Sequence, residues 1–123
     1  MWTLRLSPRN KGKQHEEMAR HFLEKQGLIF IAQNFAYAGG ELDLIMQHGT
    51  QLVFIEVRYR KSQQYGGAAG SINAGKIHKI RNTAGLYLAK HYPKNAPACR
   101  FDVIAMSGDA QQPHIEWIRN AFE

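Results

Sequence analysis

The chain has 123 residues, 44% of them hydrophobic, which is the size of one ordinary domain with a single core of modest size. Its net charge of +6 favours polyanionic partners, although charge alone does not prove nucleic-acid binding. The single cysteine excludes an intrachain disulfide, and no stretch approaches the ~20 apolar residues of a membrane span. We therefore expect a cytoplasmic protein without membrane contact.

Residues 1–10 mix charge, Ser and Pro without a long apolar run, which predicts a flexible basic lead-in and no signal peptide. A single domain is expected over residues 11–123. It should begin with a helix from about Lys11 to Gln26, because apolar residues recur there at helical spacing and Gly27 can end the helix. Glu16 falls at the edge of the apolar stripe of this helix.

Three strands are expected next, because runs of apolar and β-branched residues alternate with turn residues. These strands are Leu28–Phe35, Glu41–Met46 and Leu52–Arg60, and His48-Gly49 suggests a hairpin between the second and the third.

The second half of the chain begins with Ser62–Gly70, whose Gly, Gln and Ser content predicts a mobile loop. A helix from about Ala74 to Tyr92 and two strands, Cys99–Met106 and His114–Ile118, should follow. The order α-β-β-β-α-β-β predicts an α/β fold in which helices flank a mixed sheet.

The hairpin carries carboxylates inside apolar strands, which is uncommon because burying an unpaired charge is expensive. Side chains alternate along a strand, so Glu41 and Asp43 share one face and Glu56 and Arg58 share a face of the next strand. The alternative to a functional site is a set of salt bridges with Arg58 and Arg60 on a solvated face.

The register of the hairpin decides whether these charged faces coincide. A turn with an even number of residues, such as His48-Gly49, places Asp43 opposite Phe54 and diagonal to Glu56, with α-carbons roughly 7–8 Å apart. Two carboxylates at that distance can share one cation. We predict the even register, in which Glu41, Asp43 and Glu56 repel each other unless a cation lies between them.

Several of these residues together resemble known patterns. Asp43, twelve further residues and then Glu56-Val57-Arg58 resemble the PD-(D/E)XK nuclease motif, with Arg in place of the usual Lys. An ordered set along nearly the whole chain resembles the YraN-like family of bacterial proteins. The set comprises Gly12, Glu16, Ala19, Gly27, Asn34, Gly40 to Ile45, Val53 to Arg58, Lys76 and Arg100 to Ile104.

The resemblance implies a restriction-endonuclease-like fold, similar in layout to archaeal Holliday-junction resolvases. It implies that Asp43 and Glu56 bind Mg²⁺ or Mn²⁺, that the Val57 carbonyl is a third oxygen ligand and that Glu16 is the helix acid of the site. Mg²⁺ suits such a set, because it prefers oxygen ligands and binds one or two carboxylates together with water and substrate phosphate.

Arg58 departs from the motif, because an Arg cannot lose its proton in a protein and so cannot activate water as a Lys could. We expect it to act electrostatically on the phosphate. Arg60, Lys61, Lys76 and Lys79 can continue a phosphate-binding track, although helical Lys and Arg more often form a plain solvated face.

The leading interpretation is a metal-dependent DNA endonuclease that hydrolyses phosphodiester bonds, with Asp43, Glu56, Arg58 and Glu16 at its catalytic site. The alternatives are a noncatalytic nucleic-acid-binding module on the same fold and a protein-interaction domain. Analogy with junction resolvases, which need two sites, favours a homodimer.

Overall fold

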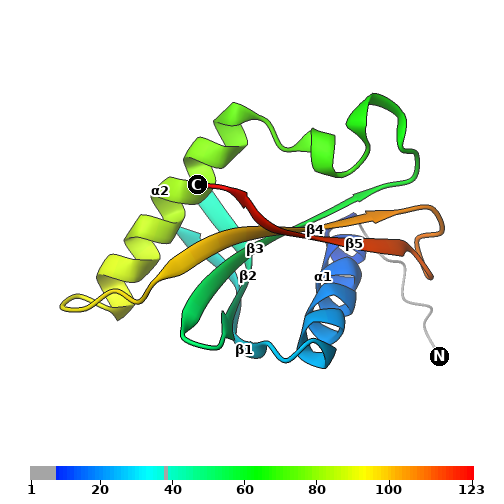
Figure 1. The fold of residues 1–123 in the computed structure, drawn as a ribbon. Coiled ribbons are helices and arrows are strands. Elements are labelled where there is room, and N and C mark those ends of the chain that lie inside the picture. Colours follow the sequence, from blue (N-terminus) through cyan, green and yellow to red (C-terminus); the bar gives the residue numbers. More distant parts are fainter. Residues whose placement is uncertain (1–7, 38) are drawn as a thin grey trace, which may run out of the picture.

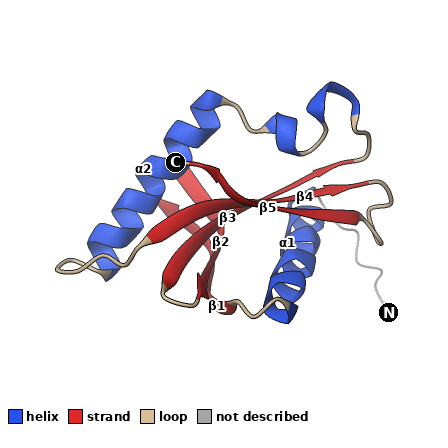
Figure 2. Cartoon of the chain, viewed as in Figure 1, coloured by secondary structure: helices blue, strands red, loops and turns tan. Residues whose placement is uncertain are grey.

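Two helices lie on opposite faces of one five-stranded sheet (Figures 1 and 2). Apart from the side chains at 8–11 and 65, the computed structural model describes residues 8–37 and 39–123. The predicted element order and mixed sheet are confirmed. The main elements are α1 (Pro8–Lys25), β1 (Ile29–Tyr37), β2 (Gly40–His48), β3 (Gln51–Arg60), α2 (Ala74–His91), β4 (Cys99–Ser107) and β5 (His114–Phe122).

The strands follow chain order across the sheet, β1-β2-β3-β4-β5. Only the central pair, β3 and β4, is parallel, and the other three pairs are antiparallel. A parallel pair needs a long crossover, and α2 supplies it on one face of the sheet. Helix α1 covers the other face (Figure 1), so β2 and β3 are buried on both sides.

Helix α1 buries Ala19 and Leu23 against the sheet and ends at a glycine. Gly27 has a φ of +97°, and the Leu28 N–H donates to the Leu23 carbonyl at 3.1 Å, the pattern of a left-handed helix cap. The helix starts at Pro8, so residues 8–10 of the predicted lead-in belong to it; residues 1–7 of that lead-in lie outside the described residues.

Helix α2 begins at the predicted cap Asn73, whose side chain accepts a hydrogen bond from the Lys76 N–H at 2.9 Å. Its buried face includes Ile80, Ala84 and Tyr87, which pack against β2 and β3.

The hairpin register is the principal correction to the sequence prediction. The turn is Gly49-Thr50, with His48 paired to Gln51, so the pairing is offset by two residues from the predicted one. The loop still has an even number of residues, and the charged faces therefore still coincide. Asp43 is not opposite Phe54: the ladder ends at the pair of Leu44 with Ile55, and Asp43 and Glu56 are the next residues beyond it.

The segment predicted as a mobile loop contains two short 3₁₀ helices, Gln64–Gly66 and Ala69–Ser71. Ala68 lies between them, is almost fully buried and packs against Val103 and Ala105 of β4. The loop is therefore anchored to the sheet at its middle, a contact that its Gly-rich composition did not indicate.

Candidate metal centre

Strands β2 and β3 separate at the point where their acidic residues lie. Beyond the Leu44–Ile55 pair, the Val57 N–H donates to Oδ2 of Asp43 at 2.9 Å instead of to a backbone carbonyl. Leu42 also packs on the α2 side, whereas strict alternation would place it with Leu44 on the α1 side. The strand therefore twists at Asp43, and its carboxylate is held in the opening between the two strands.

Three carboxylates converge at this opening. Glu16 of α1 and Glu41 and Asp43 of β2 each offer an oxygen, and these three atoms lie within 4.8 Å of one another. The apolar stripe of α1 packs on the sheet and carries Glu16 along its edge, which brings the helix acid to the strand acids. Such a group of hard oxygen donors can hold a metal ion.

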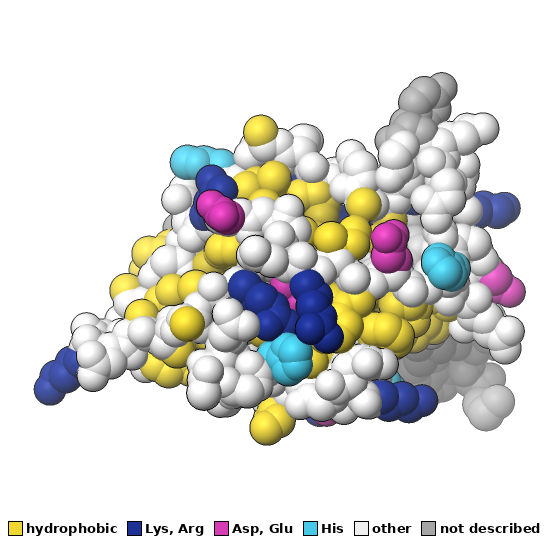
Figure 3. All heavy atoms as spheres, viewed as in Figure 1, with side chains coloured by type: hydrophobic (Ala, Val, Ile, Leu, Met, Phe, Trp, Pro, Cys, Tyr) yellow, Lys and Arg dark blue, Asp and Glu magenta, His cyan; other side chains and the backbone are white. Residues whose placement is uncertain are grey.

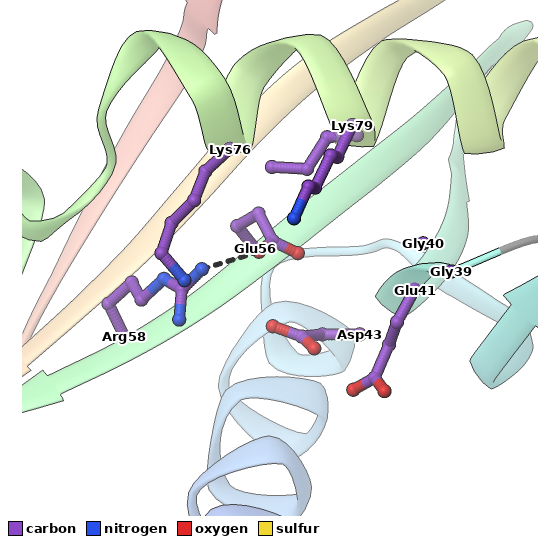
Figure 4. A pocket seen from close by; sticks show the side chains of 9 residues that line it. Gly39, Gly40, Glu41, Asp43, Glu56, Arg58, Lys76 and Lys79 are labelled. Atoms are coloured by element: carbon purple, nitrogen blue, oxygen red, sulfur yellow. Dashed lines mark hydrogen bonds and ion pairs between the residues drawn. The ribbon is translucent and has the colours of Figure 1, made fainter.

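Glu56 lies on the α2 side of the same opening, in a hollow of about 210 Å³ that also includes Asp43 and Glu41. Arg58 donates from Nη2 to Oε1 of Glu56 at 3.1 Å, and both side chains are largely buried. Figure 4 shows Lys76 and Lys79 reaching from α2 toward these carboxylates. Acidic and basic side chains thus line one hollow, which we call the acidic hollow.

A larger hollow of about 600 Å³ lies on the α1 side and shares Glu41, Asp43 and Arg58 with the acidic hollow. Glu16 and Val57 lie on its wall, and so do Arg60 and Lys61 at the end of β3 and beyond. We call it the α1-side hollow. Asp43 therefore borders both hollows, and basic side chains lie on both sides of it.

Burial dominates the electrostatics of Glu56 and Asp43. Loss of water and then the neighbouring charge of Asp43 raise the pKa of Glu56 to about 9, against the lowering effect of Arg58. Burial likewise raises the pKa of Asp43, although the Val57 N–H and Arg58 act in the opposite direction. Without a cation, the pair therefore retains a proton at neutral pH.

Glu16 shows the same pattern and carries an unpaired atom. Burial, followed by the charges of Asp43 and Glu41, raises its pKa to about 7. Its Oε1 is buried and has no hydrogen-bond partner among the described residues. A buried acceptor without a donor is costly, and a divalent cation would satisfy it and relieve the repulsion among the acids. The residues present therefore fit a metal ion.

The predicted site residues divide between the two hollows. Glu56, Lys76 and Lys79 line the acidic hollow, Glu16, Val57, Arg60 and Lys61 line the α1-side hollow, and Asp43 and Arg58 line both.

Glu41 is closer to the centre than the sequence prediction allowed. The sequence prediction left Glu41 out of the ligands of a single ion and considered it, with Glu16, only as support for a second ion. The structure groups it with Glu16 and Asp43. The available signal was its alternation with Asp43, which puts both side chains on one face of β2.

Asp102 of β4 is a buried acid that serves the fold. It accepts hydrogen bonds from Trp117 Nε1 and the Asn120 N–H, both at 2.9 Å, and from Arg100 Nε at 3.0 Å. These donors come from β4 and β5, so Asp102 links the two strands at this edge of the sheet. It is not grouped with the acids of the metal centre.

The surplus of basic side chains is distributed over the surface. On the face shown in Figure 3, Lys and Arg side chains occur at several separate places among hydrophobic and uncharged ones. Within the described residues, neither long helix is apolar enough to cross a membrane. The basic residues gathered at the acidic hollow therefore indicate a phosphate-binding site more specifically than the scattered surface charge does.

The family model for the uncharacterised protein family UPF0102 matches residues 15–106, which include every acid of the candidate metal centre. The protein YraN of Escherichia coli O1:K1 / APEC is 48% identical over 118 residues, which cover 95% of this chain and 87% of that protein. The YraN of Shigella flexneri serotype 5b (strain 8401) gives the same values. The chain belongs to the UPF0102 family.

Proposed function

We propose that this protein is a metal-dependent endonuclease that hydrolyses phosphodiester bonds in DNA. The observation that carries the proposal is the convergence of Glu16, Glu41 and Asp43, of which Glu41 and Asp43 line one hollow together with Lys76 and Lys79. Acids that can hold a cation and bases that can hold a phosphate lie side by side, as phosphodiester hydrolysis requires. The order of elements and the PD-(D/E)XK spacing support a restriction-endonuclease-like fold.

The acids hold and orient a divalent cation, which we take to be Mg²⁺ or Mn²⁺. When bound, the ion supplies Lewis-acid polarisation of the phosphate and of the attacking water. Asp43 is the central ligand, because it borders both hollows and the Val57 N–H fixes its carboxylate. Glu16 and Glu41 complete the group on the α1 side, and Glu56, with the Val57 carbonyl, completes it on the β3 side.

The basic residues hold the phosphate. Arg58 pairs with Glu56 through Nη2 and lines both hollows, where its guanidinium can contribute positive charge to a bound phosphate. Lys76 and Lys79 stand opposite on α2 and can neutralise charge that develops as the bond breaks (Figure 4). Arg60 and Lys61 extend the phosphate track past the metal centre.

A noncatalytic nucleic-acid-binding protein is the second candidate, and one observation favours it. Arg58 stands where the motif usually has Lys, and it holds Glu56 in a largely buried ion pair. Under this candidate the same surface binds DNA but does not cut it. Both candidates are compatible with cytoplasmic location and with a homodimer, which would present two sites to a branched substrate.

Cleavage assays separate the two candidates. Purified protein is incubated with junction, flap and duplex DNA in Mg²⁺ or Mn²⁺, and Asp43→Asn is compared with Asp109→Asn, an exposed acid in the turn before β5. We expect metal-dependent cutting that Asp43→Asn abolishes and Asp109→Asn preserves. Binding without cutting of any of these substrates would favour the noncatalytic candidate, and equal activity of the two variants would contradict the assigned site.

A further inference from the structure

A third hollow, of about 390 Å³, adjoins the acidic hollow and shares Gly39, Gly40 and Lys79 with it. Its volume lies in the range of about 300–1,000 Å³ that is usual for small-ligand pockets. Tyr37 at the end of β1 lines it together with Asn82 and Leu86 of α2. We call it the Tyr37 hollow.

The walls of the Tyr37 hollow carry exposed apolar side chains. Three large hydrophobic residues are exposed among the described ones, namely Tyr37 at 54%, Leu86 at 39% and Ile29 at 65%, and the first two line this hollow. A single exposed apolar residue needs no explanation, but an exposed aromatic ring and an exposed aliphatic side chain that line one hollow form an apolar slot that suits a flat ring.

The basic residue at the boundary links the slot to the proposed phosphate site. Lys79, Asn82 and Leu86 follow each other at intervals of three and four residues, so they form one stripe along α2. Lys79 lies at the end of that stripe nearest the acidic hollow and lines both hollows, and Figure 4 shows its side chain next to Glu56. A phosphate at Lys79 therefore places the attached nucleoside next to the slot.

We propose that the Tyr37 hollow receives an unstacked base of the DNA strand whose phosphate is bound at Lys79, with Tyr37 stacking on the base. The inference rests on the proposed function and names its substrate class: DNA with unpaired nucleotides next to the bound phosphate. Stacking on an aromatic side chain tolerates any base sequence. A base inside a continuous duplex can enter only after it leaves its stack, which costs free energy and disfavours intact duplex.

The test is equilibrium binding of a single-stranded oligonucleotide and of the matched duplex, with 2-aminopurine as a fluorescent base, in buffer containing EDTA so that no strand is cut. We expect Tyr37→Ala to weaken single-strand binding about 5- to 150-fold. Duplex binding should change less than about twofold, by the same argument. Tyr37→Phe should bind like the wild type, because it keeps the ring.

Ile29→Ala is the matched control, because Ile29 is exposed on the same strand but is not part of the slot. The inference is overturned if Tyr37→Ala loses equal affinity for single strand and duplex, or if it binds single strand as tightly as the wild type. It is also overturned if Tyr37→Phe binds as weakly as Tyr37→Ala, or if the wild type binds no single strand. Stacking that depends on Tyr37 without cutting in Mg²⁺ would overturn the proposed function alone. Cutting with no effect of Tyr37→Ala would overturn the inference alone.

Discussion

Glu16 combines the unfavourable burial and the charge repulsion of the site in one side chain. Its carboxylate is partly buried beside two other acids, and one of its oxygens lacks a donor among the described residues. The arrangement costs stability as long as the charges are uncompensated, and it becomes favourable when a cation binds. Single-residue changes at this site should therefore have opposite effects with and without metal.

Glu16→Gln should raise the Tm of the metal-free protein at pH 8 by a few degrees, because an amide removes the repulsion by Asp43 and Glu41. It should also reduce the stabilisation by Mn²⁺, which for the wild type is about 2.7 kcal/mol at 100 times its Kd. Thermal unfolding with and without Mn²⁺ measures both effects. The control is Glu17→Gln, an exposed neighbour on α1. Identical behaviour of the two variants would contradict the role of Glu16.

The stability of the metal-free protein should fall as the pH rises from about 5 to 9. Burial raises the pKa of Glu16 to about 7 and that of Glu56 to about 9, from an ordinary value of 4.5. The folded state therefore holds protons that the unfolded state has already released, and raising the pH favours unfolding. Denaturant unfolding across this pH range measures the slope, and a Glu16→Gln/Glu56→Gln double variant should flatten it. A wild-type slope that the double variant leaves unchanged would show that other groups cause it.

Arg58→Lys should speed metal-dependent cleavage by about tenfold or more, because a Lys can lose its proton and general acid–base catalysis contributes about 10²–10⁴-fold. Single-turnover cleavage rates of the two proteins give the ratio. Slower cleavage by the variant would mean that the reaction needs the guanidinium of Arg58 and its bond to Glu56.

At the level of elements, the position of α2 depends on the close approach of its Thr83 to β2. Gly40 lies against this side chain, so a Cβ at position 40 would overlap the Thr83 hydroxyl and lie 3.4 Å from the Lys79 carbonyl. Because α2 carries Lys76 and Lys79, this contact also sets the distance between the basic residues and the acids.

Gly40→Ala should destabilise the protein by about 1–3 kcal/mol, the usual cost of overpacking. Adding Thr83→Ala should recover part of the loss, because it removes the overlapping hydroxyl. Gly85→Ala on α2 is the control: a Cβ there meets no atom within 4 Å, and the change should stabilise by up to about 1 kcal/mol. Chemical denaturation measures the wild type, the two single variants Gly40→Ala and Thr83→Ala, their double variant and Gly85→Ala. Additive effects of the Gly40 and Thr83 changes would contradict the proposed contact.

The sequence predicted the elements well because their signals are local. Apolar periodicity located α1 and α2. A single glycine, Gly27, predicted the end of α1, and in the structure it adopts the left-handed conformation that a helix cap needs. The hairpin register was wrong by two residues, since His48-Gly49 and Gly49-Thr50 are both plausible two-residue turns and alternation specifies only the parity. The contact between Gly40 and Thr83 joins two distant elements, and no local pattern indicated it.

At the scale of the whole molecule, the candidate site depends on three elements that are separate in the chain. Asp43, Glu56 and Glu16 were predicted from motif spacing and family resemblance. The even number of residues in the hairpin loop was enough to predict that the two strand acids share one face. Alternation indicated that Glu41 lies near Asp43, but how closely both approach Glu16 depends on how α1 lies across the sheet and on the twist of β2 at Asp43. The Tyr37 hollow likewise exists only once α2 packs beside β1 and β2.

The central claim is that the acids of α1, β2 and β3 hold a divalent cation, and anomalous diffraction from a crystal soaked in Mn²⁺ tests it most directly. We expect an anomalous peak within coordination distance of Asp43 and at least one of Glu16, Glu41 and Glu56, and no peak there in an Asp43→Asn crystal. A fully soaked wild-type crystal with no peak beside Asp43 would contradict it.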